Sequence, residues 1–222
     1  MVASALAASP PAAGHRAHGS EHASVFSDIY QRDYWRLGGE SSSGPGSRRE
    51  WTRGLQRELP KLLARLGVSS VLDIGCGDFN WMREVDLGAV LYTGADVVFD
   101  VVLENRLRYG GARRRFVYRD LTRHPLPRAD LVLCRDVLIH FPDEDLVPAM
   151  RAIVDTGARY LLAGTFLGRS ENPPIVLGDW RPLNMQLPPL SMPPPTDWLV
   201  ETVSEPGYED KRLALWDLRA LR

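Results

Sequence analysis

Short runs of apolar residues alternate along this chain with longer segments in which apolar residues recur every three or four positions. The runs predict β-strands and the longer segments predict helices between them. Turn residues, polar residues or proline bound each run, as is usual for strands. We expect five such strands, at Ser70–Ile74, Leu91–Ala95, Arg115–Tyr118, Leu131–Cys134 and Arg159–Gly164. This alternation predicts a parallel sheet with crossover helices on both faces.

Helices are expected before and between these strands. Their predicted ranges are Val25–Trp35, Glu50–Leu66, Asn80–Val85, Val98–Arg108 and Asp143–Asp155. The stretch Gly38–Ser47 is rich in glycine and serine and is expected to be a flexible turn. Its last residues, Ser43–Ser47, precede the second helix, and a serine there can cap the helix N-terminus.

The pattern changes after the fifth strand. Eight prolines fall between Gly168 and Pro195, and proline is excluded from helix interiors and central strands. This segment is therefore an ordered lid or a flexible linker. The last two apolar runs, Trp198–Val203 and Arg212–Leu218, flank Glu205-Pro206-Gly207, a strong turn signal, so they are expected to pair as an antiparallel hairpin.

A chain of 222 residues suits one α/β domain, which we expect at residues 24–222. Residues 1–23 are rich in alanine, proline, glycine and histidine, which predicts a disordered tail. The net charge of −1 produces no field that would attract nucleic acid or an anionic membrane, so we expect neither partner. No stretch approaches the roughly 20 apolar residues of a membrane span.

Two cysteines, Cys76 and Cys134, are too few for a disulfide framework and lack the spacing of metal ligands. We expect both to be small buried packing residues at one edge of the sheet. A reducing, cytoplasmic setting follows as the default.

A glycine-containing loop follows the first strand directly. Gly75 and Gly77 allow a sharp turn and a close approach of the backbone to a ligand. A dinucleotide-binding loop would carry a third glycine three residues after Gly77, but Asn80 stands there. Instead an acid, Asp73, precedes the first glycine by two residues.

This Asp-x-Gly-x-Gly arrangement resembles the first motif of the class I methyltransferases that use S-adenosylmethionine (SAM). The family has a Rossmann-like sheet of seven strands that ends in an antiparallel hairpin. Its motif usually carries one more glycine, where this chain has Phe79.

The resemblance implies an acid at the end of the second strand that accepts the ribose hydroxyls. Asp96 stands there, 23 residues after Asp73; a solvated strand-end carboxylate is the alternative. An acid near the adenine amino group is implied at Asp120. The cofactor-binding residues implied in this way are Asp73, Gly75, Cys76, Gly77, Asn80, Trp81, Asp96, Val97, Asp120, Leu121 and Arg135.

The chain also resembles one bacterial subgroup of this family over about residues 25–218. The shared motifs are Ser-Gly-Pro-Gly-Ser at 43–47, Asp-Ile-Gly-Cys-Gly-Asp-Phe-Asn-Trp at 73–81, Cys-Arg-Asp at 134–136 and Gly-Asp-Trp-Arg-Pro-Leu-Asn at 178–184. We can name no assigned substrate for the subgroup. The resemblance therefore implies the fold and the cofactor more firmly than the reaction.

The fourth strand delivers three polar side chains to the edge where open α/β sheets bind ligands. Asp136 and His140 are candidates for the base that removes a proton from the methyl acceptor. His140 alternatively ties the loop together, and Arg135 either binds a substrate carboxylate or phosphate or braces Asp136.

Three residues of the proline-rich segment are expected to bind the acceptor. Trp180 offers a stacking surface, and Arg181 and Asn184 offer hydrogen bonds. The alternative is that Trp180 anchors the loop to the core and Arg181 is solvated.

These observations predict methyl transfer from SAM, which becomes S-adenosylhomocysteine, to an oxygen of a small polar molecule such as a sugar-containing natural product or glycan precursor. Nitrogen is the less favoured acceptor atom. No paired acids after the fourth strand indicate a metal site. The alternatives are a SAM-binding regulatory protein without chemistry and, less favoured, a nicotinamide-dependent oxidoreductase. The sequence leaves the oligomeric state open.

Overall fold

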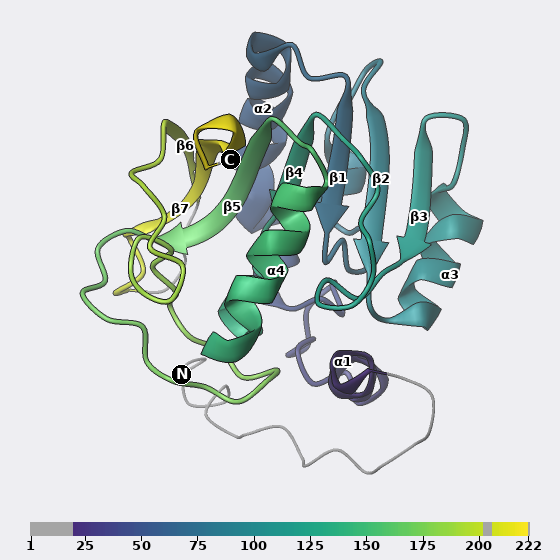
Figure 1. Cartoon of the computed structure of the whole chain (residues 1–222). Coiled ribbons are helices and arrows are strands. Elements are labelled where there is room, and N and C mark those ends of the chain that lie inside the picture. Colours follow the sequence, from purple (N-terminus) through teal and green to yellow (C-terminus); the bar gives the residue numbers. More distant parts are fainter. Residues whose placement is uncertain (1–19, 202–205, 222) are drawn as a thin grey trace.

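Seven strands form one mixed sheet in the order β3-β2-β1-β4-β5-β7-β6. The computed structural model describes residues 20–201 and 206–221 (Figure 1). Residues 1–19 of the predicted tail lie outside the described part. The strands are β1 Ser70–Ile74, β2 Leu91–Asp96, β3 Arg114–Tyr118, β4 Leu131–Cys134, β5 Tyr160–Phe166, β6 Asp197–Val200 and β7 Lys211–Asp217. The predicted α/β class, seven strands and terminal hairpin are confirmed.

The first five strands are parallel, and β7 is the antiparallel member. Val71 of β1 lies opposite Tyr92 of β2 and Leu131 of β4. β7 pairs antiparallel with both β5 and β6. The end of β6 and the start of β7 therefore reach the edge at which the parallel strands end, which we call the carboxyl edge.

Helices cover both faces of the sheet and its carboxyl edge. Figure 1 shows α4 on one face, α2 on the other, and α1 beyond the carboxyl ends of the strands. The α-helices are α1 Glu21–Gln31, α2 Arg49–Leu66, α3 Phe99–Tyr109 and α4 Asp143–Asp155.

The alternation of side chains along the central strands divides the core into two layers. Leu72 and Val132 face the layer that contains α1 and α4 residues. Val71, Leu131 and Leu133 face the layer that contains α2 residues. All five side chains are buried, and each contributes roughly 1.5–3 kcal/mol of hydrophobic stabilisation.

Two of the predicted helices differ from those observed. The first begins at Glu21 rather than Val25, because the Ser20 side chain caps it by accepting a hydrogen bond from the Ala23 N–H. The predicted boundary at residue 23 therefore falls within this helix. The predicted helix Asn80–Val85 is wrong: only the 3₁₀ turn Met82–Glu84 forms there.

The proline-rich segment is an ordered loop. Leu183 and Met185 are fully buried in the core, and the Phe166 N–H donates to the Leu183 carbonyl. The flexible-linker alternative is therefore wrong. Residues 202–203 of the first predicted hairpin strand lie outside the described part. No helix within residues 20–201 and 206–221 has the length and hydropathy to cross a bilayer.

Candidate functional site

A cavity of about 240 Å³ opens at the carboxyl edge. Its walls come from the ends of β1, β2 and β4, from α1, from residues 43–47 and from the proline-rich loop. α1 contributes His22, Phe26 and Tyr30. Figure 1 shows this helix across the ends of the strands, so the N-terminal helix forms a wall of the site.

The loop after β1 approaches its neighbours so closely that only glycine fits. Gly75 and Gly77 have φ values of +65° and +54°. A Cβ on Gly75 would lie 2.3 Å from Val137 Cγ2, and one on Gly77 would lie 2.2 Å from Ser43 Oγ. The glycines therefore allow Val137, which follows β4, and the 43–47 segment to close over the loop.

Asp96, the last residue of β2, is buried on the cavity wall. Its Oδ2 accepts a hydrogen bond from the Gly77 N–H at 2.9 Å, and its Oδ1 accepts one from the Val98 N–H at 2.9 Å. Burial raises the pKa of Asp96, and these backbone hydrogen bonds oppose the rise. Each oxygen keeps further acceptor capacity for a ligand hydroxyl. We call Gly75, Gly77 and Asp96 the glycine-loop end of the cavity.

Asp78 fastens the serine-rich segment to this loop. Its carboxylate accepts hydrogen bonds from the Ser41 hydroxyl at 2.9 Å, the Ser42 N–H at 2.8 Å and the Ser43 hydroxyl at 3.1 Å. Ser43 Oγ also lies 2.6 Å from the Tyr30 hydroxyl of α1. The predicted flexible turn is thus held by hydrogen bonds.

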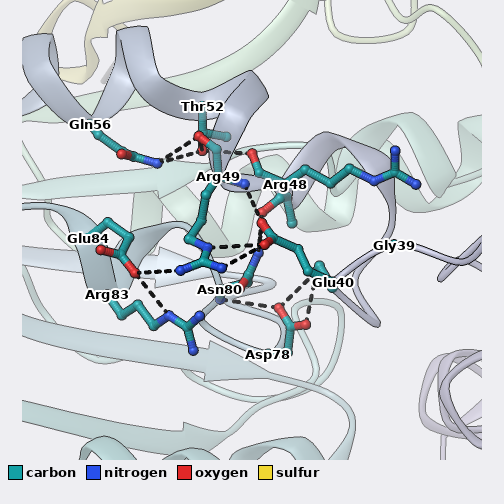
Figure 2. Close-up of polar contacts among 12 residues, drawn as sticks. Gly39, Glu40, Arg48, Arg49, Thr52, Gln56, Asp78, Asn80, Arg83 and Glu84 are labelled. Carbon is teal, nitrogen blue, oxygen red and sulfur yellow. Dashed lines mark hydrogen bonds and ion pairs between the residues drawn. The ribbon is translucent and has the colours of Figure 1, made fainter.

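Glu40 makes a second connection between this segment and the loop (Figure 2). Its carboxylate accepts from the Arg49 N–H at 2.7 Å and from Asn80 Nδ2 at 3.0 Å, while Asn80 Nδ2 also donates to the Ser47 carbonyl at 2.9 Å. The hydrogen bonds from Arg49 lower the pKa of Glu40 to about 2. Glu40, rather than a serine of the 43–47 segment, therefore accepts the hydrogen bond from the first backbone N–H of α2. The Asn80 side chain is engaged in hydrogen bonds within the protein.

Several residues predicted to bind the cofactor are not among the residues that line the cavity. Asp73 accepts a hydrogen bond from the Tyr92 hydroxyl at 2.6 Å, and burial raises its pKa to about 7. Cys76 is buried in the core, and Asp120 accepts from the Thr122 hydroxyl at 2.8 Å. The guanidinium carbon of Arg135 lies over Trp81, 5.5 Å from the ring centroid. The predicted residues on the wall itself are Gly75, Asp96, Val97, Leu121, Arg135, Asp136, His140 and Trp180.

Four charged side chains form a second group at the cavity. Arg135 Nη2 lies 2.5 Å from Glu201 Oε2, and its Nη1 lies 3.2 Å from Asp136 Oδ2. Lys211 Nζ lies 2.8 Å from Asp136 Oδ1 and 3.3 Å from Glu201 Oε2. We call these four residues the ion-pair end.

Arg135 therefore braces Asp136, which was one of its two predicted roles. Burial raises the pKa of Asp136, but the charges of Arg135 and Lys211 outweigh burial and hold the pKa below its usual range. A carboxylate with a lowered pKa is a weak base. The structure thus argues against Asp136 as the proton acceptor.

His140 is placed differently on the same wall. Its Nδ1 lies 2.7 Å from the Asp179 carbonyl, which can only accept, so Nδ1 carries the proton and Nε2 keeps its lone pair. The ring stacks on Trp35 with centroids 4.7 Å apart. Burial lowers the pKa of His140, so the ring is neutral at pH 7.

Only one of the three loop residues predicted to bind the acceptor reaches the cavity wall. Trp180 lines the cavity beside Phe166 and Tyr208. Arg181 is buried, donates to the Phe141 carbonyl at 2.8 Å and pairs with a carboxylate of α4. Asn184 donates to the Arg169 carbonyl at 2.8 Å. Arg181 and Asn184 therefore hold the loop in shape.

The sequence predictions missed Glu201 and Lys211. Lys211 is one of only two lysines among the 27 lysine and arginine residues. The rarity of lysine in this chain could have marked Lys211 as a candidate site residue. Glu201 gave no local signal. Among the described residues, no group of three or more histidine, cysteine, aspartate or glutamate side chains is placed to hold a metal ion.

The strand order, with β7 antiparallel between β5 and β6, and the cavity at the carboxyl edge define the class I fold of SAM-dependent methyltransferases. The chain is similar to magnesium protoporphyrin IX methyltransferase from Synechocystis PCC 6803, solved with bound SAM. The identity is 19%, the TM-score is 0.57, and the match covers 90% of this chain and 98% of that one.

The N-methyltransferase NodS from Bradyrhizobium japonicum WM9, solved with S-adenosylhomocysteine, matches at 20% identity. Its TM-score is 0.48, and the match covers 62% of this chain and 73% of that one. No protein-family model and no curated protein matches this sequence. At 19% identity, the similarity to magnesium protoporphyrin IX methyltransferase establishes the fold alone.

Proposed function

We propose that this protein transfers the methyl group of SAM to an oxygen of a small polar molecule, such as a sugar-containing natural product or glycan precursor. Nitrogen is the less favoured acceptor atom. The glycine-loop end binds the methyl donor, and the ion-pair end with His140 and Trp180 receives the acceptor.

The observation that carries the proposal is the position of Asp96. Its carboxylate lies on the cavity wall at the end of β2, is oriented by two backbone N–H groups and has acceptor capacity left for a pair of hydroxyls. The ribose of SAM offers such a pair. The glycine loop beside Asp96 supports the same assignment, since side chains at Gly75 or Gly77 would collide with the walls of the cavity.

The strand order disfavours the oxidoreductase alternative. Nicotinamide-binding domains have the order 3-2-1-4-5-6 with all strands parallel. Here an antiparallel β7 lies between β5 and β6. Asn80, in the position of the third glycine, is engaged with Glu40 and Ser47.

SAM supplies a methyl group on a positively charged sulfur, which an acceptor oxygen can displace. The C–S bond breaks as the C–O bond forms, and the hydroxyl proton must leave. His140 Nε2 takes this proton, since the Asp179 carbonyl fixes the tautomer and burial keeps the ring neutral. The side chains of Trp35 and Trp180 exclude water from this part of the cavity.

Calorimetric titration with SAM, S-adenosylhomocysteine and NADPH tests the donor assignment. We expect SAM to bind and Asp96→Ala to raise its Kd at least 100-fold, because two hydrogen bonds to a charged group contribute about 3 kcal/mol or more. Asp100→Ala is the matched control, since it removes an exposed carboxylate four residues away, at the start of α3. NADPH binding without SAM binding, or an unchanged Kd in Asp96→Ala, would refute the proposal.

Label transfer from methyl-tritiated SAM to added small molecules separates an enzyme from a regulatory SAM-binding protein. Transfer to a recovered product supports the proposal. SAM binding without transfer to any neutral, amino or acidic compound supplied favours the regulatory alternative.

A further inference from the structure

The ion-pair end pairs its two cations with its two carboxylates but leaves one carboxylate oxygen without a donor. Lys211 Nζ has three oxygen contacts, with both oxygens of Asp136 and with Glu201 Oε2. The Arg135 guanidinium is engaged with the same two carboxylates. Glu201 Oε1, in contrast, has no hydrogen-bond partner among residues 20–201 and 206–221.

This oxygen belongs to a buried side chain on the cavity wall. Glu201 is 5% exposed and lines the cavity. A buried carboxylate oxygen without a donor carries a desolvation cost that no hydrogen bond offsets. Native structures rarely keep such a group without a purpose.

We propose that Glu201 Oε1 is the acceptor-recognition atom of this enzyme and takes a hydrogen bond from a hydroxyl of a neutral, polyhydroxylated acceptor. This inference rests on the proposed methyl transfer and specifies its substrate class. Glu201 selects the acceptor, and His140 removes the proton from the hydroxyl that is methylated.

The position of Glu201 in the sheet assigns it to the acceptor rather than to SAM. β6 is four strand positions from β1 in the sheet order, and neighbouring strands are about 4.8 Å apart. The backbone of Glu201 therefore lies roughly 19 Å from the glycine loop in the plane of the sheet. Its side chain turns back toward β4 and meets Arg135, so it borders the part of the cavity beyond the donor.

Charge and hydrogen-bonding capacity together define the ligand class. The cavity wall carries three acidic and three basic side chains, so it does not select for a charged acceptor. A carboxylate on the acceptor would have to compete with Asp136 and Glu201 for Arg135 and Lys211, which already pair with both of these carboxylates. A neutral hydroxyl satisfies Glu201 Oε1 without disturbing either ion pair.

The experiment compares three glycosides that share one ring: methyl glucoside, its amino analogue methyl glucosaminide and its acidic analogue methyl glucuronide. Transfer from methyl-tritiated SAM is measured with the wild type and with Glu201→Gln, together with the calorimetric Kd for SAM. Asp197→Asn is the matched control, because it removes the charge of a carboxylate on β6, the strand that Glu201 follows, and this carboxylate pairs with exposed Arg65.

We expect the wild type to favour methyl glucoside over methyl glucuronide at least tenfold in kcat/KM. Glu201→Gln should raise the KM for the glucoside at least tenfold and leave the SAM Kd within twofold. Asp197→Asn should change neither value.

Preference for the glucuronide or the glucosaminide overturns the proposal, as does transfer to none of the three by a protein that binds SAM. A Glu201→Gln variant that weakens SAM binding but not the acceptor KM also overturns it. Failure of the wild type to bind SAM refutes the proposed function instead, so the two failures are distinguishable.

Discussion

The two ends of the cavity are formed by different kinds of chemical group. The glycine-loop end is shaped by backbone: two left-handed glycines and the N–H groups that orient its one carboxylate, Asp96. The ion-pair end consists of side chains, with Arg135 and Lys211 between the buried carboxylate of Glu201 and the partly buried carboxylate of Asp136. A backbone site holds a ligand whose shape does not vary, whereas a side-chain site changes with a few substitutions. The difference suits a constant methyl donor and an acceptor that differs among related folds.

The sharpest test of this contrast is His140→Gln, which should reduce turnover and spare donor binding. Loss of a positioned base typically costs 10²–10⁴-fold in rate, while the SAM Kd should stay within twofold. Because burial lowers the pKa of His140 and its neutral form acts, wild-type kcat should rise with pH through a midpoint below 6.5 and then level off.

A pH series of kcat, measured with the best acceptor found by label transfer, checks the His140 prediction. The acidic limb should be absent in His140→Gln. If His140→Gln turned over within threefold of the wild type, His140 would not be the base.

Arg135→Met is expected to have the largest effect on stability. The substitution leaves the buried carboxylate of Glu201 and the partly buried carboxylate of Asp136 with only Lys211 for a partner. Breaking a buried ion pair typically costs about 3–5 kcal/mol. Arg65→Met is the control: its partner Asp197 is exposed, and an exposed pair is worth at most about 1 kcal/mol. Urea unfolding measures both. If both variants lost the same free energy of unfolding, the ion pairs of Arg135 would contribute no more than the exposed pair of Arg65 and Asp197.

Gly77→Ala should produce the smallest of these effects and should act on donor binding. Gly88 has a similar φ of +52°, but a Cβ there would meet no atom within 4 Å, whereas a Cβ on Gly77 would meet Ser43 and Tyr30. Both alanine variants incur about 1–2 kcal/mol of backbone strain. Gly77→Ala should cost about 1–3 kcal/mol more and raise the SAM Kd at least tenfold. Similar SAM affinities in the two variants would contradict the role given to close packing around the loop.

The sequence predicted what depends on neighbouring residues. β1, β4 and α4 were predicted with their observed bounds, because buried strands and amphipathic helices carry their pattern within a few residues. The Asn80–Val85 helix failed because Phe79 leaves the loop with a left-handed backbone, and apolar periodicity does not register such a turn.

The glycine-loop end is likewise encoded by neighbouring residues. Gly75 and Asp96 were predicted as site residues, and both lie on the cavity wall. Asn80 and Arg181 were misplaced because their partners, Glu40 and the Phe141 carbonyl, are about 40 residues away in the chain. The Arg135–Glu201 pair spans 66 residues. No periodicity within the sequence reports a contact over that distance.

Phe79 gives the glycine loop a property that a third glycine would not. It has a φ of +59°, and its ring is buried against Tyr92 and Phe116. A glycine here would leave the loop free to sample many shapes, but the buried aromatic ring restricts the loop. The loop is therefore preorganised, and the entropy lost on binding falls instead on the ligand and on the acceptor side of the cavity.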